Sequence, residues 1–481
     1  MRGAGLRACD VVIANGTVVT AAGRYGIDLG IRDGRVAVVG ERGGPLPRGV
    51  KAGDLAPDAP EVIDARGKLV LPGLIDVHTH FGLTSGELAT SDDFSSGTVA
   101  AASGGVTTII DFATPRPGQT VAEAVAERRR EASASVIDYS FHGVLIEPPA
   151  ADEVGALAED GITSFKLYMA YRARGLMASE ATLAGALAAA GKVGGLVGVH
   201  AEDEEMVEAA AAGLQRAGRT ALAFFPASRP PGAESLAIAR ACRMAEAAKA
   251  PLYIFHLSTA AGLDEIRQAR ARGVRVWAET CPHYLTLTDE VYARDDGCRF
   301  VMNPPLRKRA DVEALWTGLA GHEIQVVSSD HCPFPLAAKA RGAVSFLDAP
   351  PGIGGTELIL TLLLSEGVAK GRLSLERLVQ VTSADPARLF GLYPRKGRVA
   401  PLAHADFVIV DPDEEWTVGS GGLPSRCDYT PYEGLRARGR VALTMARGRV
   451  VYRNGEFVGQ AGAGRFLRRR PTRPLRLERG T

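Results

Sequence analysis

Two kinds of hydrophobic pattern alternate along this chain. Residues 10–70 contain short runs rich in Val and Ile that are separated by Gly turns, as in VVIANGTVV and DLGIRDGRVAVVG. Residues 396–460 repeat this pattern, for example in VALTMARGRVVYRNGEF. Such runs predict hairpin-rich sheets. We therefore predict that residues 1–70 and 395–460 are two parts of one β-sandwich, brought together because the middle of the chain closes on itself.

Between these ends, short apolar runs alternate with Ala-rich helical stretches such as TVAEAVAERRREASA and SLAIARACRMAEAA. This alternation indicates a parallel sheet with crossover helices. The candidate strands are LIDVHTH, VTTIIDF, DYSFHGVL, ITSFKLYM, LVGVH, LYIFHL, VRVWAET and IQVVSSD. Eight such units predict an α/β fold, a (β/α)8 barrel, over residues 71–394.

The last segment, residues 461–481, is basic and interrupted by prolines, as in GRFLRRRPTRPLRLERGT. Two interpretations of this tail stay open. It is either a disordered end of the chain or an arm that packs on a neighbouring subunit.

Composition and charge narrow the functions that fit this architecture. The chain has 481 residues and a formal net charge of +1, and 46% of its residues are apolar, enough for a sizeable core. The near-zero net charge gives no electrostatic reason to expect binding to nucleic acid or to an anionic membrane. We find no run of about 20 apolar residues and no long apolar signal core. Six scattered cysteines are typical of reduced thiols, so we expect a cytoplasmic protein.

The ends of the predicted strands carry side chains that can bind metal. In a (β/α)8 barrel the chemistry takes place at the C-terminal ends of the strands. His78 and His80 end the first strand, and because residues i and i+2 point to the same side, both can reach one ion. Other strand ends carry Lys166, His200, His256 and Asp330. Imidazole and carboxylate groups are suitable zinc ligands, so the sequence predicts a metal site at this face.

The other histidines are not needed for this site. His142 lies on the third predicted strand, and we interpret it as a hydrogen-bonded core histidine. His322 and His404 lie in loop-like segments and receive no role.

Several longer motifs resemble those of one enzyme family. Residues 78–112, HTHFGLTSGELATSDDFSSGTVAAASGGVTTIIDF, resemble the first metal-binding stretch of hydantoinases and dihydropyrimidinases in the amidohydrolase superfamily. SFKLYMAY resembles their lysine strand, SSDHCPF their aspartate strand, and DYTPYEG and GRFLRRRP their C-terminal signatures. The resemblance covers essentially the whole chain, and it is far more specific for the family than for the substrate.

The resemblance implies a hydrolase that opens the ring of hydantoins or dihydropyrimidines at a cyclic amide C–N bond. It implies two divalent ions, usually zinc, bridged by the carbamate that Lys166 forms with carbon dioxide. It also implies a small cyclic amide or ureide as substrate and a homo-oligomer, either a dimer or a tetramer. Tyr171 matches the family's phenol that donates to the developing oxyanion, and Asp330 matches the residue that carries the proton to the departing nitrogen.

Five positions depart from the family pattern or separate its branches. Asn303 stands before Pro-Pro where serine is usual, and we expect ring N–H and C=O groups to pair around it. His283, in ETCPHYL, is typical of dihydroorotases and allantoinases. Gly82 stands where dihydroorotases have an arginine for the substrate carboxylate. Pro351 replaces a substrate-contacting asparagine, and Gly175 replaces a bulky aromatic, so we expect room for a large ring substituent.

These departures leave two alternatives open. The first is an allantoinase or another hydrolase of cyclic ureides. The second is a non-catalytic scaffold protein of the same family, which is disfavoured because all six ligand positions are filled.

Overall fold

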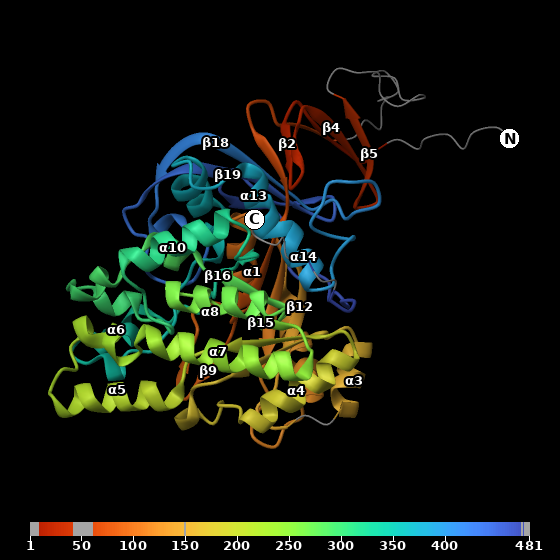
Figure 1. Ribbon diagram of the computed structural model, residues 1–481. Coiled ribbons are helices and arrows are strands. Elements are labelled where there is room, and N and C mark those ends of the chain that lie inside the picture. Colours follow the sequence, from red (N-terminus) through yellow and green to blue (C-terminus); the bar gives the residue numbers. More distant parts are fainter. Residues whose placement is uncertain (1–8, 42–60, 149–150, 473–474, 476–481) are drawn as a thin grey trace.

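The computed structural model describes residues 9–41, 61–148, 151–472 and 475, and the middle of the chain forms a closed barrel (Figure 1). Eight parallel strands follow one another around it in sequence order. They are β8 (Leu74–Thr79), β11 (Val106–Ala113), β12 (Asp138–Val144), β13 (Ser164–Tyr168), β14 (Leu196–His200), β15 (Leu252–Ile254), β16 (Val276–Thr280) and β17 (Val326–Val327). A parallel bridge between Thr79 and His331 joins the first strand to the segment after the last. This confirms the predicted (β/α)8 barrel.

Helices cover the outside of the barrel, as crossover connections require. The longer ones are α1 (Phe94–Ser103), α2 (Val121–Glu131), α3 (Ala151–Glu159), α4 (Glu180–Lys192), α5 (Glu204–Arg216), α7 (Pro231–Ala248), α8 (Ala260–Ala271) and α10 (Arg309–Ala320). Asp93 and Thr120 start α1 and α2 with capping boxes, in which side chain and backbone N–H groups satisfy each other. The connection after β17 consists of short helices, including α12 (Ile359–Leu362), α13 (Leu375–Val379) and α14 (Asp385–Leu389).

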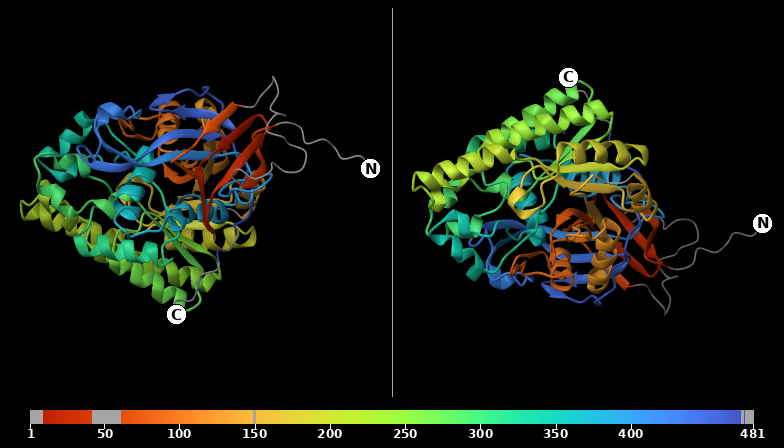
Figure 2. Two further views of the ribbon diagram at one scale, coloured as in Figure 1. Left: turned by 90° about the horizontal axis from the view of Figure 1, so that it is seen from above. Right: turned by 90° about the horizontal axis from the view of Figure 1, so that it is seen from below.

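The two ends of the chain form the predicted second module (Figure 2). One sheet has the order β5 (Arg35–Glu41), β4 (Ile27–Arg32), β1 (Val11–Ala14), β6 (Glu61–Asp64). The other has the order β21 (Glu456–Phe457), β20 (Arg449–Arg453), β19 (Arg436–Ala446), β18 (Phe407–Thr417), β7 (Leu69–Pro72), β2 (Thr17–Thr20), β3 (Gly23–Tyr25). β18 pairs with β7, which joins the C-terminal half to the N-terminal half. Buried side chains of both sheets, such as Ile13 and Phe407, share one hydrophobic core.

The beginning of the C-terminal tail packs on the barrel of its own chain. The Leu467 N–H donates to the Tyr139 carbonyl at 2.7 Å, and the Tyr139 N–H donates to the Arg465 carbonyl at 3.0 Å. Residues 461–472 are therefore not a disordered end, because Phe466 and Leu467 pack on an apolar surface of β12 and the adjoining core. The alternative, an arm that packs on a neighbouring subunit, stays a prediction. Residues 473–474 and 476–481, which belong to the same predicted tail, lie outside the described residues.

Arg469 anchors this tail at the N-terminal ends of the strands, opposite the predicted site. Its guanidinium is buried and donates to Ser140 Oγ at 2.9 Å, to Ser164 Oγ at 2.7 Å and to the Phe141 carbonyl. Burial lowers the pKa of Arg469 to about 9. The three acceptors thus compensate a buried charge that would otherwise be unfavourable.

We predict that Arg469→Ala lowers the free energy of unfolding by about 2–3 kcal/mol, because it leaves buried acceptors without a donor. The measurement is the urea unfolding midpoint, with Arg468→Ala as the matched control. Arg468 is exposed and contacts the Glu159 carbonyl at the surface. Equal losses in the two variants would contradict an anchoring role for Arg469.

None of the helices within the described ranges combines the length and the apolar character needed to cross a bilayer.

Candidate active site

A cavity of about 380 Å³ lies at the C-terminal ends of the barrel strands. All six predicted ligand residues line it: His78, His80, Lys166, His200, His256 and Asp330. Tyr171 and Asn303, predicted to contact substrate, line it as well. Side chains that are separated by more than 250 positions in the sequence therefore share one cavity, because parallel strands in a closed barrel end at the same face.

His78, His80 and Asp330 form one group of possible ligands. Their ligand atoms lie within 4.8 Å of one another. Asp330 Oδ1 lies 3.1 Å from His78 Nε2 and 3.3 Å from His80 Nε2. His78 lies on β8 and His80 directly follows its last residue, Thr79, and the two-residue spacing brings both imidazoles to Asp330, as the sequence predicts.

His200 and His256 form a second group. Nδ1 of His200 lies 2.9 Å from Nε2 of His256. The backbone of His256 has φ 39° and that of Asp330 has φ 50°, both in the left-handed region that residues other than glycine rarely adopt. Such conformations occur where the surrounding structure holds a functional side chain in place.

Lys166 lies at the floor of the cavity and is almost completely buried. Its Nζ lies 3.9 Å from the centroid of the Phe255 ring and 5.0 Å from that of Phe112. Burial lowers the pKa of Lys166 to about 8, although the charges of Asp330 and Glu279 act in the opposite direction. A fraction of this lysine is therefore neutral, and nucleophilic, near neutral pH.

The protonation of the site suits metal binding. Burial lowers the pKa of His80, His200 and His256, which favours the neutral imidazole that metals bind. Burial would raise the pKa of Asp330, but the charge of His78 and the close approach of the His78 and His80 imidazoles hold it well below its usual range. The result is an anionic carboxylate beside imidazoles, a donor set that fits divalent cations such as zinc.

Two buried ring nitrogens of the cavity histidines lack a hydrogen-bond partner among the described residues, which bears on whether this site can bind a metal ion. Among the described residues, His78 Nε2 and His256 Nδ1 are buried and have no partner with hydrogen-bond geometry. Buried ring nitrogens are normally satisfied, so these two atoms, on residues that line the cavity, are free to act as metal ligands. The donor set and these orphaned atoms both fit a metal centre.

A layer of acidic residues behind the histidines was missed by sequence reasoning. Glu279 Oε1 lies 2.5 Å from His78 Nδ1 and accepts from the His256 N–H at 3.2 Å. Glu202 Oε2 lies 2.8 Å from His200 Nε2 and also contacts Arg229. A carboxylate on the rear nitrogen orients a ligating imidazole. Glu279 stands near the end of the seventh predicted strand, and this position in the sequence could have identified it as a residue at the cavity end of the barrel.

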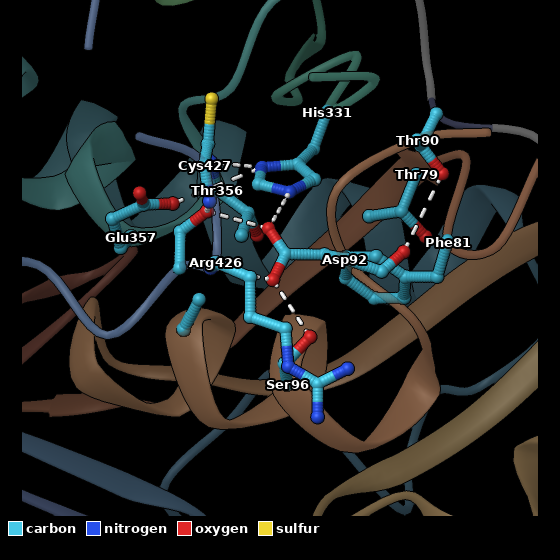
Figure 3. A network of polar contacts seen from close by, with 12 residues as sticks. Thr79, Phe81, Thr90, Asp92, Ser96, His331, Thr356, Glu357, Arg426 and Cys427 are labelled. Atoms are coloured by element: carbon cyan, nitrogen blue, oxygen red, sulfur yellow. Dashed lines mark hydrogen bonds and ion pairs between the residues drawn. The ribbon is translucent and has the colours of Figure 1, made fainter. Parts of the chain in front are cut away.

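A second missed network surrounds Asp92 and His331 (Figure 3). Nε2 of His331 lies 3.0 Å from Asp92 Oδ2, which also accepts from Ser425 Oγ at 2.5 Å. Asp92 Oδ1 accepts from Ser96 Oγ at 2.7 Å and from the Arg426 N–H at 2.9 Å. The network joins the segment before α1, the end of the eighth strand and the C-terminal part of the chain. It thereby holds the residue that follows Asp330.

Tyr171 lies at the cavity wall in a left-handed conformation with φ 74°. Its N–H and that of Arg172 donate to the Glu204 carboxylate at 2.8 and 2.9 Å, which fixes this turn. Burial raises the pKa of Tyr171 to about 12, so its phenol keeps its proton and can donate it in a hydrogen bond. Asn303 Oδ1 is buried without a hydrogen-bond partner among the described residues, which leaves an acceptor for a bound molecule.

Lys339 holds the segments on which Asn303 and Pro351 lie. Its buried ammonium donates to the carbonyls of Val301 at 2.6 Å, Pro350 at 2.8 Å and Gly352 at 2.9 Å. The Gly352 N–H donates to the Val301 carbonyl at 2.9 Å. Since proline has no N–H and that of Gly352 is used, this part of the wall offers no backbone donor from either residue.

The expected room for a large ring substituent at Gly175 stays a prediction, and a Cβ atom placed on this glycine would meet no atom within 4 Å. Gly175 does not line the cavity, whereas its neighbour Leu176 does. Gly175 has φ 67° and ends the short helix η2 (Arg172–Arg174), so glycine serves the left-handed turn here. Gly82 also has positive φ, 61°, and no side chain of its own to place a cation near His80.

The remaining histidines lie outside the cavity. His142 is buried, with Nε2 2.9 Å from the Val77 carbonyl and Nδ1 2.6 Å from Ser164 Oγ, so its prediction as a core histidine is confirmed. Burial lowers the pKa of His283 to about 4.

Sequence and fold are similar to those of known proteins. The sequence profile of the amidohydrolase family matches residues 69–451. D-phenylhydantoinase from Escherichia coli O1:K1 / APEC is 42% identical over 471 residues, which are 96% of this chain and 99% of that protein. Dihydropyrimidinase from Brevibacillus agri NCHU1002 has a TM-score of 0.91 at 38% identity, over 96% of this chain and 99% of that one. L-hydantoinase from Arthrobacter aurescens has a TM-score of 0.85 at 31% identity, and the match covers 96% of this chain and 100% of that one.

Proposed function

Because this chain belongs to the hydantoinase family of the amidohydrolase superfamily, we propose that it hydrolyses an amide C–N bond in a cyclic ureide or imide, opening a five- or six-membered ring. The observation that supports this most directly is the convergence of four histidines, Asp330 and Lys166 on one cavity that Tyr171 also lines. A scaffold protein without catalysis would not require this donor set.

The proposal includes two divalent ions, with zinc as the expected metal. His78, His80 and Asp330 would hold one of them, and His200 and His256 the other. Lys166 would be a ligand of both ions in its carbamate form. This form would arise when the neutral Nζ bonds to the carbon of carbon dioxide and one proton is released. When bound, two such ions supply a water molecule activated at neutral pH and an electrophile for the amide carbonyl.

The chain's own residues move the proton and hold the substrate. Asp330 carries an ionised carboxylate at the cavity, so it can accept the proton of the attacking water and return it to the ring nitrogen that leaves. The phenol of Tyr171 keeps its proton and can donate to the carbonyl oxygen as negative charge develops there. Oδ1 of Asn303 can accept from a ring N–H.

We expect the protein, loaded with zinc, to hydrolyse hydantoin, dihydrouracil and 5-phenylhydantoin. The cavity of about 380 Å³ leaves room for a ring substituent. Dihydroorotate should have a kcat/KM at least about tenfold lower, because Gly82 supplies no cation for a carboxylate on the ring, and an unpaired charge is unfavourable. The measurement is kcat/KM for these four compounds and allantoin under one set of conditions.

Other outcomes of this panel would replace the proposal. Allantoin as the best substrate would favour the allantoinase alternative, and dihydroorotate as the best would show that our interpretation of Gly82 is wrong. No turnover, together with metal analysis showing no bound divalent ion, would favour the scaffold alternative.

We further propose a cytoplasmic homo-oligomer, a tetramer or a dimer, in keeping with the family resemblance. Size-exclusion chromatography with light scattering distinguishes these from a monomer.

A further inference from the structure

Arg174 places a positive charge on the cavity wall away from the proposed metal ligands. The charged side chains that line the cavity, within the described ranges, are Arg174 and the metal-site groups. Leu83, Leu176 and Phe334 are among the apolar side chains that line the same cavity. A cation on the wall of a substrate cavity is a candidate for recognising an anionic part of the substrate, because opposite charges attract more strongly near a protein surface than in bulk water.

The local backbone fixes the position of Arg174 relative to the reaction site. Arg174 ends η2, which is flanked by left-handed residues, Tyr171 with φ 74° and Gly175 with φ 67°. The Glu204 carboxylate binds the N–H groups at the start of this turn. The guanidinium carbon of Arg174 lies 5.7 Å from the centroid of the Tyr171 ring. The guanidinium of Arg174 therefore lies close to the ring of Tyr171, the proposed oxyanion donor.

The charge of Arg174 also reaches other residues of the cavity wall. Burial raises the pKa of Tyr168 and of Cys332, and the positive charge of Arg174 acts in the opposite direction on both. The neighbouring Arg172 does not line the cavity, and its side chain forms ion pairs with Glu205 and Glu208 on α5. Of these two arginines, Arg174 is therefore the one whose charge lies at the cavity wall.

We propose that Arg174 binds a carboxylate at the end of a substituent on the substrate ring. Resting on the proposed function, this assigns a preferred substrate class: cyclic ureides such as 5-substituted hydantoins whose side chain is acidic. Leu176 and Arg174 line the same cavity as the metal ligands and Asn303, so a substituent on a ring bound there would have this wall within its reach. A carboxylate directly on the ring, as in dihydroorotate, lacks the chain needed to extend to that wall.

The test compares 5-(2-carboxyethyl)hydantoin with its neutral isostere 5-(2-carbamoylethyl)hydantoin. We expect kcat/KM to favour the acid by about fivefold to tenfold, the range of a partly exposed charge-assisted contact. In Arg174→Gln this ratio should fall to about one, and Arg174→Lys should retain part of it, since lysine keeps the charge but not the planar fork. Arg172→Gln is the matched control and should leave the ratio unchanged. Added salt should reduce the preference of the unmodified protein.

The outcomes separate this inference from the function on which it rests. If neither hydantoin is hydrolysed, the proposed function fails. If the neutral compound is hydrolysed but the acid is not preferred, or the preference survives in Arg174→Gln, the proposal for Arg174 is overturned. An equal loss of preference in Arg172→Gln would show a general surface effect of charge and would overturn it as well.

Discussion

Lys166→Ala is expected to yield a folded protein that is depleted of metal and at least about a thousandfold less active, since a bound ion contributes several kcal/mol to stabilising the transition state. Alanine removes the Nζ atom that we propose to react with carbon dioxide, so the two proposed ions would lose their common ligand. The aromatic rings of Phe255 and Phe112 lie 3.9 and 5.0 Å from Nζ of Lys166, so the truncated side chain keeps apolar neighbours and the fold should be retained. The measurements are metal content by elemental analysis and kcat/KM for hydantoin.

Small carboxylic acids provide a second measurement on the same variant. Acetate or propionate can occupy the vacated space and offer the two oxygens of a carboxylate, so both metal content and activity should rise in part. Lys192→Ala, at the exposed end of α4, is the matched control and should behave like the unmodified protein. Full metal occupancy together with full activity in Lys166→Ala alone would show that this lysine is not a ligand.

Asp330→Asn is expected to retain much of the metal and to lose at least about a hundredfold in kcat, the contribution of a positioned proton carrier. The amide has the same shape as the carboxylate and keeps an oxygen near His78 and His80, but it cannot accept and return a proton at neutral pH. The measurement is kcat at saturating hydantoin, with metal content determined on the same sample.

Asp93→Asn is the matched control for this change. Asp93 caps α1 at the surface, and asparagine caps helices equally well, so activity and metal content should not change. Turnover of Asp330→Asn close to that of the unmodified protein would show that another group carries the proton. Loss of all metal would instead assign Asp330 mainly as a ligand.

The fold was predictable because its signals are local and repeated. Each barrel strand is a short apolar run between helical stretches, many of them rich in Ala, and all eight predicted runs overlap a strand of the barrel. The six side chains at the cavity followed from the same pattern, because parallel strands must end at one face. His78 and His80 needed only the two-residue period of a strand.

The residues that support the site were not predictable in this way. Glu279 and His78 are 201 positions apart, and Asp92 and His331 are 239 positions apart. Neither pair has a spacing that a sequence pattern can reveal. The role of Gly175 in the backbone was not predictable either: this glycine adopts a left-handed turn, and only the structure shows that its neighbour Leu176 lines the cavity.

The sequence by itself determined the barrel, the pairing of the two chain ends and the chemical types of side chain at the cavity, since periodicity and strand ends are properties of short segments. The tertiary structure alone decided which histidine meets which carboxylate, how Lys339 holds two loops, how Arg469 anchors the tail and that Arg174 lines the cavity. The physical reason is that these contacts join segments far apart along the chain. Their partners are selected by the packing of the whole barrel and by the need to satisfy each buried polar group, neither of which acts within one segment.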